Sequence, residues 1–289
     1  MGYLLLSIVS STLIFVLFKS FEKFGINNLY AIITNYVIAG LLGYIFSPSH
    51  YSFDIVSTKP WFIGAICIGL LFIILFQIMA LTAQKFGVAR VSVAVKMSIV
   101  LPVIAGLWLF NESISIWSVT GIILALLAVY LGTRKEHSNK VKFSKWLLAL
   151  PIILFFGDGM IGVLMKYAQY NWLKPNEMST FSGVLFGSAF VWGLFFLLYQ
   201  TIYKHKYPTL KDVFGGILLG IPNFGSIYFL LLALDTSGMP SAAIFPINNV
   251  AIVGISAIVG LLVFKEHLSR LNYLGLALGI ISILLITNG

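Results

Sequence analysis

Charged residues inside apolar stretches of the sequence are the first candidates for chemistry. Lys96 lies eight residues into one such stretch, and Asp158 lies between two glycines in the middle of another. Lys19 and Lys166 lie near the ends of apolar stretches. A charge at the centre of a membrane helix costs roughly 2.5 to 3.5 kcal/mol on insertion scales, so each of these residues needs a partner or a ligand.

The types of these side chains indicate which ligands they would bind. Lysines that face one cavity would bind the carboxylate or phosphate of an anionic or zwitterionic solute. Asp158 would bind a cation or a proton, or neutralise a neighbouring lysine. Structural alternatives stay open: an ion pair or extension to the membrane surface for Lys96, and a solvated helix end beside Glu22 for Lys19.

Three asparagines follow prolines closely within apolar stretches. Asn223 comes directly after a proline, and Asn248 and Asn249 follow another within three residues. Proline leaves a helix carbonyl without its hydrogen-bond donor, which a nearby amide can replace. Each asparagine therefore either completes its helix or contacts a solute. Asn35 and Gln77 are expected to form hydrogen bonds with neighbouring helices.

The composition indicates that these residues lie in a membrane protein. Of the 289 residues, 60% are hydrophobic and only 9% are charged. Soluble domains average about 45–50% apolar and about 25% charged residues, so this chain cannot cover the surface of a soluble fold of its length. The net charge of +9 comes from residues between apolar stretches, and a nucleic-acid partner is not expected. The expected surroundings are a lipid bilayer.

Ten apolar segments approach the roughly 20 residues that a membrane-spanning helix needs. The sequence therefore predicts an all-α polytopic membrane protein with ten transmembrane helices. The predicted segments are Tyr3–Phe21, Leu29–Phe46, Trp61–Ala83, Val88–Phe110, Trp117–Gly132, Trp146–Ala168, Met178–Tyr203, Val213–Leu234, Met239–Phe264 and Leu271–Thr287.

Two similar turns indicate that the chain contains an internal repeat. Asn-Glu-Ser around Glu112 returns as Lys-Glu-His around Glu266, and a glycine follows each glutamate after nine residues. A repeat of five helices is odd in number, so its two copies must have opposite orientations in the membrane, as in many secondary transporters. The predicted domains are a first five-helix repeat over 1–134, a basic linker over 135–145 and a second five-helix repeat over 146–289.

The paired turns and the five-helix spacing resemble the drug/metabolite transporter superfamily, in its ten-helix form with two EamA-like repeats. This resemblance covers essentially the whole chain. It implies a secondary transporter that works by alternating access, with a central cavity lined mainly by the first, third, fourth, sixth, eighth and ninth segments. Lys96, Asp158, Lys166, Lys19, Asn249, Asn248 and Asn223 are the predicted substrate-binding residues. The identity of the substrate and coupling to a proton or another ion stay open.

The distribution of basic residues predicts the orientation. Fourteen of the 18 Lys and Arg residues lie in or beside the connections that follow the odd-numbered segments, and two, Lys59 and Lys174, lie on the other side. The positive-inside rule places the larger group in the cytoplasm and both termini outside. The superfamily resemblance implies the reverse, and we favour the charge count. The expected location is the bacterial cytoplasmic (inner) membrane.

Several other residues are assigned structural roles. Glu112 and Glu266 are expected to cap the fifth and tenth predicted helices. Glycine pairs with GxxxG spacing are expected to pack helices within one chain, which favours a monomer or weak dimer. The predicted hinges are Pro102, Pro151, Pro222 and Pro246, and the glycine pairs are Gly183/Gly187, Gly216/Gly220 and Gly275/Gly279.

Two other functional classes compete with a transporter. A membrane-embedded enzyme is disfavoured because the four histidines lie in connections and Asp158 is the only deeply placed carboxylate. No catalytic residue, cofactor or metal is expected, and the P-loop of a nucleotide-driven pump is absent. A receptor or scaffold without transport remains the main alternative, although the longest polar loop, 133–145, is short for binding partners.

Overall fold

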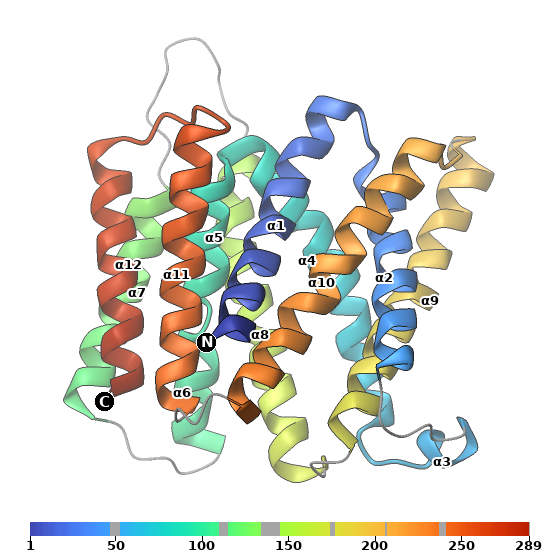
Figure 1. Cartoon of the computed structure of the whole chain (residues 1–289), viewed down its shortest axis with the longest axis horizontal. Helices are drawn as coiled ribbons and strands as arrows, with labels where there is room; N and C mark the ends of the chain where they lie inside the picture. The colour runs from blue at the N-terminus through green and yellow to red at the C-terminus, as the bar shows by residue number, and fades with distance from the viewer. Residues whose placement is uncertain are drawn as a thin grey trace.

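The computed structural model of the chain describes residues 1–46, 53–109, 115–133, 145–173, 177–205, 207–236 and 241–288. These residues form helices and no strands (Figure 1). The helices are α1 (Gly2–Phe24), α2 (Asn28–Ile45), α3 (Phe53–Ser57), α4 (Phe62–Phe86), α5 (Val88–Met97), α6 (Val100–Leu109), α7 (Ile116–Thr133), α8 (Lys145–Asn171), α9 (Met178–Lys204), α10 (Leu210–Thr236), α11 (Ser241–Leu262) and α12 (Arg270–Asn288).

Many of these helices have the length and composition of membrane spans. Within the described ranges, seven helical stretches are long and apolar enough to cross a bilayer, and three further apolar helices are shorter. The prediction of an all-α protein with multiple membrane-length helices is therefore confirmed. The seven longer stretches are Gly2–Phe24, Asn28–Ile45, Phe62–Phe86, Val88–Gly106, Ala149–Ala168, Thr180–Lys204 and Leu210–Leu230.

Short connections turn neighbouring helices back on each other. α1 ends at Gly25, whose backbone has φ 65°, and two residues later the Asn27 side chain accepts a hydrogen bond from Leu29 N at 3.0 Å and caps α2. α4 ends at Gly87, with φ 98°, and α5 begins at the next residue. Glycine adopts positive φ without the steric cost of a Cβ atom, so both turns fit the sequence.

The connections form two groups at opposite ends of the bundle. The connections from α1 to α2, α4 to α5, α9 to α10 and α11 to α12 lie at the upper end in Figure 1, while α3 and the connection from α8 to α9 lie at the lower end. The upper connections are those that follow odd-numbered predicted segments, and these connections contain most of the lysines and arginines. The described basic residues of the two groups therefore lie at different ends of the molecule.

Glycines allow some pairs of helices to pack very closely. Gly275 of α12 lies against the backbone of Gly132 in α7, and Gly216 of α10 lies against Ala31 and Thr34 of α2. A Cβ atom at either glycine would overlap these neighbours. By contrast, Gly183 and Gly187 of α9 have nothing within 4 Å of a Cβ added there. The prediction that GxxxG pairs pack within the chain is wrong for this α9 pair.

One predicted segment is divided. The sequence predicts a single helix over Val88–Phe110, whereas the structure forms α5 over Val88–Met97 and α6 over Val100–Leu109. The other predicted prolines do not interrupt their helices: Pro151 and Pro222 lie inside α8 and α10. α11 also continues through position 246, whose side chain lies outside the described residues.

Candidate functional site

The candidate site lies at the break between α5 and α6, and a proline explains why the chain breaks there. Pro102 has no N–H group, so the carbonyl of Ser98 lacks the donor that an α-helix supplies four residues later. That carbonyl accepts a hydrogen bond from Leu101 N instead, at 3.0 Å. The three-residue spacing belongs to a tighter turn than an α-helix and separates the two half-helices.

Ser98 connects this break to α8. Its hydroxyl oxygen lies 2.5 Å from Oδ2 of Asp158 and 2.5 Å from the carbonyl oxygen of Val95 in the preceding turn. Ser98 is 4% exposed, and Asp158 is partly buried. The carboxyl group of α8 therefore bonds directly to the residue at which α5 ends.

Glycines on both sides of Asp158 hold α8 against its neighbours. A Cβ atom at Gly157 would overlap Leu75 of α4, and one at Gly159 would overlap Leu101 of α6. One turn later, a Cβ atom at Gly162 would lie 3.2 Å from the ring of Pro102. The glycines beside Asp158 therefore allow close approach of α4 and α6, and this packing fixes the position of the carboxyl group.

Lys96 lies two residues before Ser98 on α5. Its ammonium group and the Asp158 carboxyl group interact electrostatically across the break. Lys96 is partly exposed, and within the described part of the chain it forms no hydrogen bond and no ion pair shorter than 4 Å. The structure thus brings two of the predicted site residues together and leaves the ammonium group with hydrogen-bonding capacity for a ligand.

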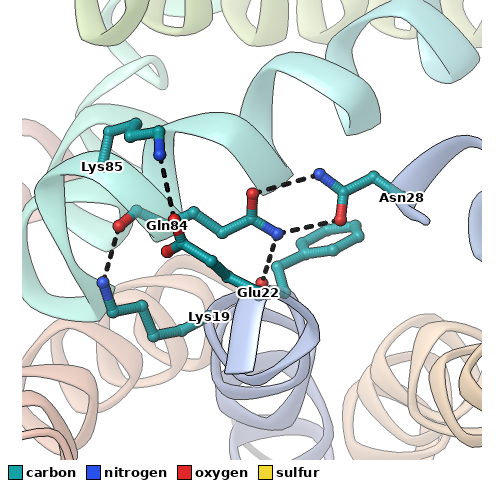
Figure 2. A network of polar contacts seen from close by, with 6 residues as sticks. Lys19, Glu22, Asn28, Gln84 and Lys85 are labelled. Carbon is teal, nitrogen blue, oxygen red and sulfur yellow. Dashed lines mark hydrogen bonds and ion pairs between the residues drawn. The ribbon is translucent and has the colours of Figure 1, made fainter. Parts of the chain in front are cut away.

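The other two predicted lysines lie apart from this pair. Lys166 is eight residues beyond Asp158 on α8, about 12 Å along the helix axis, and is partly buried. Lys19 donates a hydrogen bond to the carbonyl of Gln84 at 2.6 Å, at the end of α4 (Figure 2). The three lysines therefore do not converge on one point of the structure.

Lys19 belongs to a polar network at the upper end of the bundle. Gln84 donates to the carbonyl of Phe18 at 3.1 Å and to Oδ1 of Asn28 at 2.9 Å, which ties α4 to α1 and α2 (Figure 2). Glu22 forms its ion pair with Lys85 of α4, at 2.9 Å. The alternative interpretation of Lys19 as a helix-end residue fits this geometry, but its acidic neighbour pairs with a different lysine.

The asparagines near prolines have three different surroundings. Asn248 is buried and accepts a hydrogen bond from Ser7 of α1 at 3.2 Å. Asn223 is 4% exposed, and its side-chain nitrogen is buried without a hydrogen-bond partner. Asn249 is partly buried. Asn248 therefore connects two helices, and the buried Asn223 side-chain nitrogen does not bond the carbonyl that the adjacent proline leaves free.

Two other polar residues differ from prediction. Both side-chain atoms of Asn35 are buried without a hydrogen-bond partner, and Oε1 of Gln77 is also buried and unpartnered. The prediction that Asn35 bonds to a neighbouring helix is therefore wrong, and for Gln77 it fails at the carbonyl oxygen. The backbone carbonyl of Asn35 lies against Gly220 of α10.

Glu266 caps a different helix from the one predicted. Its carboxylate accepts hydrogen bonds from Val88 N at 2.6 Å and Ala89 N at 3.3 Å, so it caps the beginning of α5. The start of α12 is held by Ser269 and Asn272, which bond reciprocally. The fold brings the connection before α12 back against α5, which local sequence spacing does not indicate. Glu112, the other predicted cap, lies outside the described residues.

The surroundings of Glu266 have opposite effects on the pKa of its carboxyl group. Burial raises the pKa of this carboxyl above its usual value, while the hydrogen bonds from Val88 and Ala89 and the charges of Lys19 and Arg90 act to lower it. Burial has the largest effect. Arg90 itself is buried and donates hydrogen bonds to the carbonyl of His267 and to Asn272, at 3.0 and 2.9 Å.

Sequence reasoning missed Ser98, Arg90 and Asn272. Pro102 was a usable signal for Ser98, because the residue four positions before a proline in a helix loses its hydrogen-bond donor. Arg90 and Asn272 are far apart in the sequence and meet only through the fold. Across the described ranges, no group of three histidine, cysteine, aspartate or glutamate side chains has the geometry to hold a metal ion.

Comparisons with known proteins show similarity over nearly the whole chain, but they name no function. No protein-family model matches the chain. The chain is 28% identical over 284 residues to an uncharacterized protein of Haemophilus influenzae, covering 96% of this chain and 94% of that protein. It is similar over 97% of its length to a solved crystal structure, with a TM-score of 0.58, 14% identity and 96% of that chain covered. This likeness concerns the fold alone and extends over the whole chain.

Proposed function

We propose that this protein is a secondary transporter of a small anionic or zwitterionic metabolite. The observation that carries the proposal is the meeting of Lys96 and Asp158 at a break in an apolar helix. Charged residues inside membrane segments are costly and are typically functional. Discontinuous membrane helices are the typical location of substrate and ion sites in secondary transporters, because their ends supply free backbone groups.

The chemistry of the pair supports the proposed substrate class. The Lys96 ammonium group would bind the carboxylate or phosphate of the solute. Asp158 would bind the ammonium group of a zwitterion or exchange a proton. Asn223 supplies a buried amide nitrogen without a partner, on α10.

The packing of the helices supports two inverted repeats, over 1–134 and 146–289. If the first five predicted helices correspond in order to the last five, α4 corresponds to α10, and α8 and α9 correspond to α1 and α2. In the structure α4 packs against α8 and α9, and α10 packs against α1 and α2. α5 packs against α8 as α11 packs against α1. An exchange of the two halves would produce these same pairs.

The proposed mechanism is alternating access between these halves. The resemblance to the drug/metabolite transporter superfamily and the number of membrane-length helices support it. The proposed location is the bacterial inner membrane, with both termini outside as the count of basic residues predicts. In this arrangement the upper end of Figure 1, with the Lys19 and Glu266 contacts, faces the cytoplasm.

The proposal is tested by binding and transport measurements on purified protein. Thermal unfolding is recorded with panels of anionic, zwitterionic, neutral and cationic metabolites, and the stabilising solutes are then tested for counterflow into proteoliposomes. We expect stabilisation by anionic or zwitterionic solutes, and at least a tenfold loss of affinity in Lys96→Met. Lys85→Met is the matched control, because Lys85 lies in an exposed ion pair with Glu22.

Each alternative has its own outcome in this experiment. Stabilisation without counterflow would favour a receptor without transport. Stabilisation by neutral or cationic solutes alone, or full activity in Lys96→Met, would contradict the proposed site.

A further inference from the structure

The hydroxyl group of Ser98 makes two short contacts with acceptor oxygens. It lies 2.5 Å from the carbonyl oxygen of Val95 and 2.5 Å from Oδ2 of Asp158. A serine hydroxyl has one proton to donate, and a carbonyl oxygen has none. If Asp158 is ionised, the single hydroxyl proton must serve both acceptors. The Ser7 hydroxyl also lies near two acceptors, Ser226 O at 2.8 Å and Asn248 Oδ1 at 3.2 Å, whereas both Ser98 contacts are 2.5 Å, which is too short for one shared proton.

Protonation of Asp158 resolves this conflict. A carboxylic acid carries one O–H donor. Asp158 then donates its proton to Oγ of Ser98, and the Ser98 hydroxyl donates its own proton to the carbonyl of Val95. Each of the two short contacts then holds one proton, and the proton added to Asp158 comes from water. When Asp158 is ionised, the Ser98 hydroxyl donates to Oδ2, and the Val95 carbonyl keeps only the longer bond from Ser98 N at 3.3 Å.

The geometry points to Asp158 as a proton-binding site whose protonation state is transmitted by Ser98 to the end of α5. We infer that this conformation is the protonated one. Loss of the proton withdraws the Ser98 hydroxyl from Val95 and weakens the last turn before the break. Ser98 is thus a positioning residue, because it transmits the state of Asp158 to the half-helix that carries Lys96.

The charged surroundings of Asp158 are simple. α8 packs against α4, α5, α6 and α7. Beside Asp158, Leu75 of α4 lies against Gly157, and Leu101 of α6 lies against Gly159. Among the described residues, Lys96 of α5 is the charged group whose field acts on Asp158. Proton binding therefore changes the charge of this pair from neutral to +1.

This change in charge links the proton to the proposed substrate, and this step rests on the proposed function. Ionised Asp158 competes with an anionic solute for Lys96. Protonated Asp158 does not compete, so the anion binds more tightly, and by linkage the anion also favours the proton. The coupling ion left open by the sequence is then a proton, which moves in the same direction as the anion.

The proton site is tested without a ligand by infrared difference spectroscopy of the purified protein. We expect a protonated-carboxyl C=O band that titrates with pH, is lost in Asp158→Asn and remains in Asp54→Asn, an exposed carboxyl on α3. In Ser98→Ala the band should shift in frequency and in midpoint pH, because its hydrogen-bond partner is gone. Ser92→Ala is the matched control, because Ser92 bonds to the carbonyl of Ala89 on the same half-helix at 2.8 Å.

The outcomes separate this inference from the transport proposal. Absence of a band that depends on Asp158 would overturn the proton site even if transport is observed. A band that is unchanged in Ser98→Ala would overturn the role of Ser98. A band with both expected responses supports the proton site whether or not any solute binds.

Discussion

Two carboxyl groups lie at opposite ends of the same half-helix and have different kinds of partner. Glu266 meets the beginning of α5, where it accepts hydrogen bonds from Val88 N and Ala89 N. Asp158 meets the end of α5, where it contacts the hydroxyl of Ser98. A backbone N–H can only donate, so it favours an ionised carboxylate. A hydroxyl can donate or accept, so it is compatible with both protonation states.

This difference separates a structural carboxylate, Glu266, from Asp158, the one that we propose to be functional. Glu266 satisfies N–H groups that every helix leaves without partners at its start, and it ties the connection before α12 to α5. Asp158 satisfies no such requirement, and the glycines beside it suit close packing, not charge. Both carboxyls are partly buried, and both lie in the field of basic residues, so neither property distinguishes them. The type of their hydrogen-bond partner does.

The largest effect is expected when α8 is forced away from the break. In Gly159→Val the new side chain would overlap Leu101, which should lower stability by about 1–3 kcal/mol and separate Asp158 from Ser98. Thermal unfolding measures the loss. Gly183→Val is the control, because nothing lies within 4 Å of a Cβ atom at Gly183. Equal melting temperatures for the two variants would contradict the described packing.

A smaller effect is expected at the other end of α5. Glu266→Ala leaves two N–H groups without their acceptor and should cost about 1–2 kcal/mol, as for loss of a helix cap. Glu266→Gln keeps one acceptor oxygen and should cost less. Glu22→Ala, which removes an exposed ion pair, should cost under about 1 kcal/mol. A loss in Glu266→Ala no greater than in Glu22→Ala would show that the cap does not stabilise α5.

The pH dependence of stability should sharpen the comparison further. Because burial raises the pKa of Glu266, the folded protein binds its proton more tightly than the unfolded chain does. This stabilisation is complete at pH values below the ordinary glutamate pKa and is lost as the pH rises through the raised value. The melting temperature of wild type should therefore fall relative to that of Glu266→Gln across this range. A relative rise would reverse the assigned direction.

Labelling of single cysteines identifies the side of the membrane that Glu266 faces, with no expected effect on stability. In a Cys67→Ser background, a cysteine at His205 should resist an impermeant reagent in intact cells, and a cysteine at Ser57 should react. Both positions are exposed and lie at opposite ends of the bundle. The opposite labelling pattern would reverse the orientation derived from the basic residues.

The helices and the two central charged residues could be predicted from the sequence, whereas their contacts could not. Apolar stretches of membrane length predicted the helices, because hydrocarbon surroundings impose that pattern. The same reasoning identified Lys96 and Asp158 as costly charges. The break at Ser98 was not predicted, because a proline can either kink a membrane helix or divide it. In the structure Pro102 packs against Gly162 of α8, a tertiary contact that the local sequence does not indicate.

The partners of Glu266 and Lys19 depend on tertiary structure. Glu266 is 178 residues from Val88, and Lys19 is 65 residues from Gln84. Sequence spacing directed both residues to partners on their own or adjacent helices. The fold instead brings together the connections at one end of the bundle, where carboxylates and ammonium groups meet free backbone groups of other helices.

The most direct test of the central claim is the affinity of purified protein for an anionic solute, measured from acid to neutral pH in wild type and Asp158→Asn. The account predicts that wild-type affinity rises as the pH falls, by at most about tenfold per pH unit for one linked proton. In Asp158→Asn the affinity should be high and independent of pH. An affinity that falls at acid pH, or the same pH dependence in both proteins, would contradict joint binding of an anion and a proton at Lys96 and Asp158.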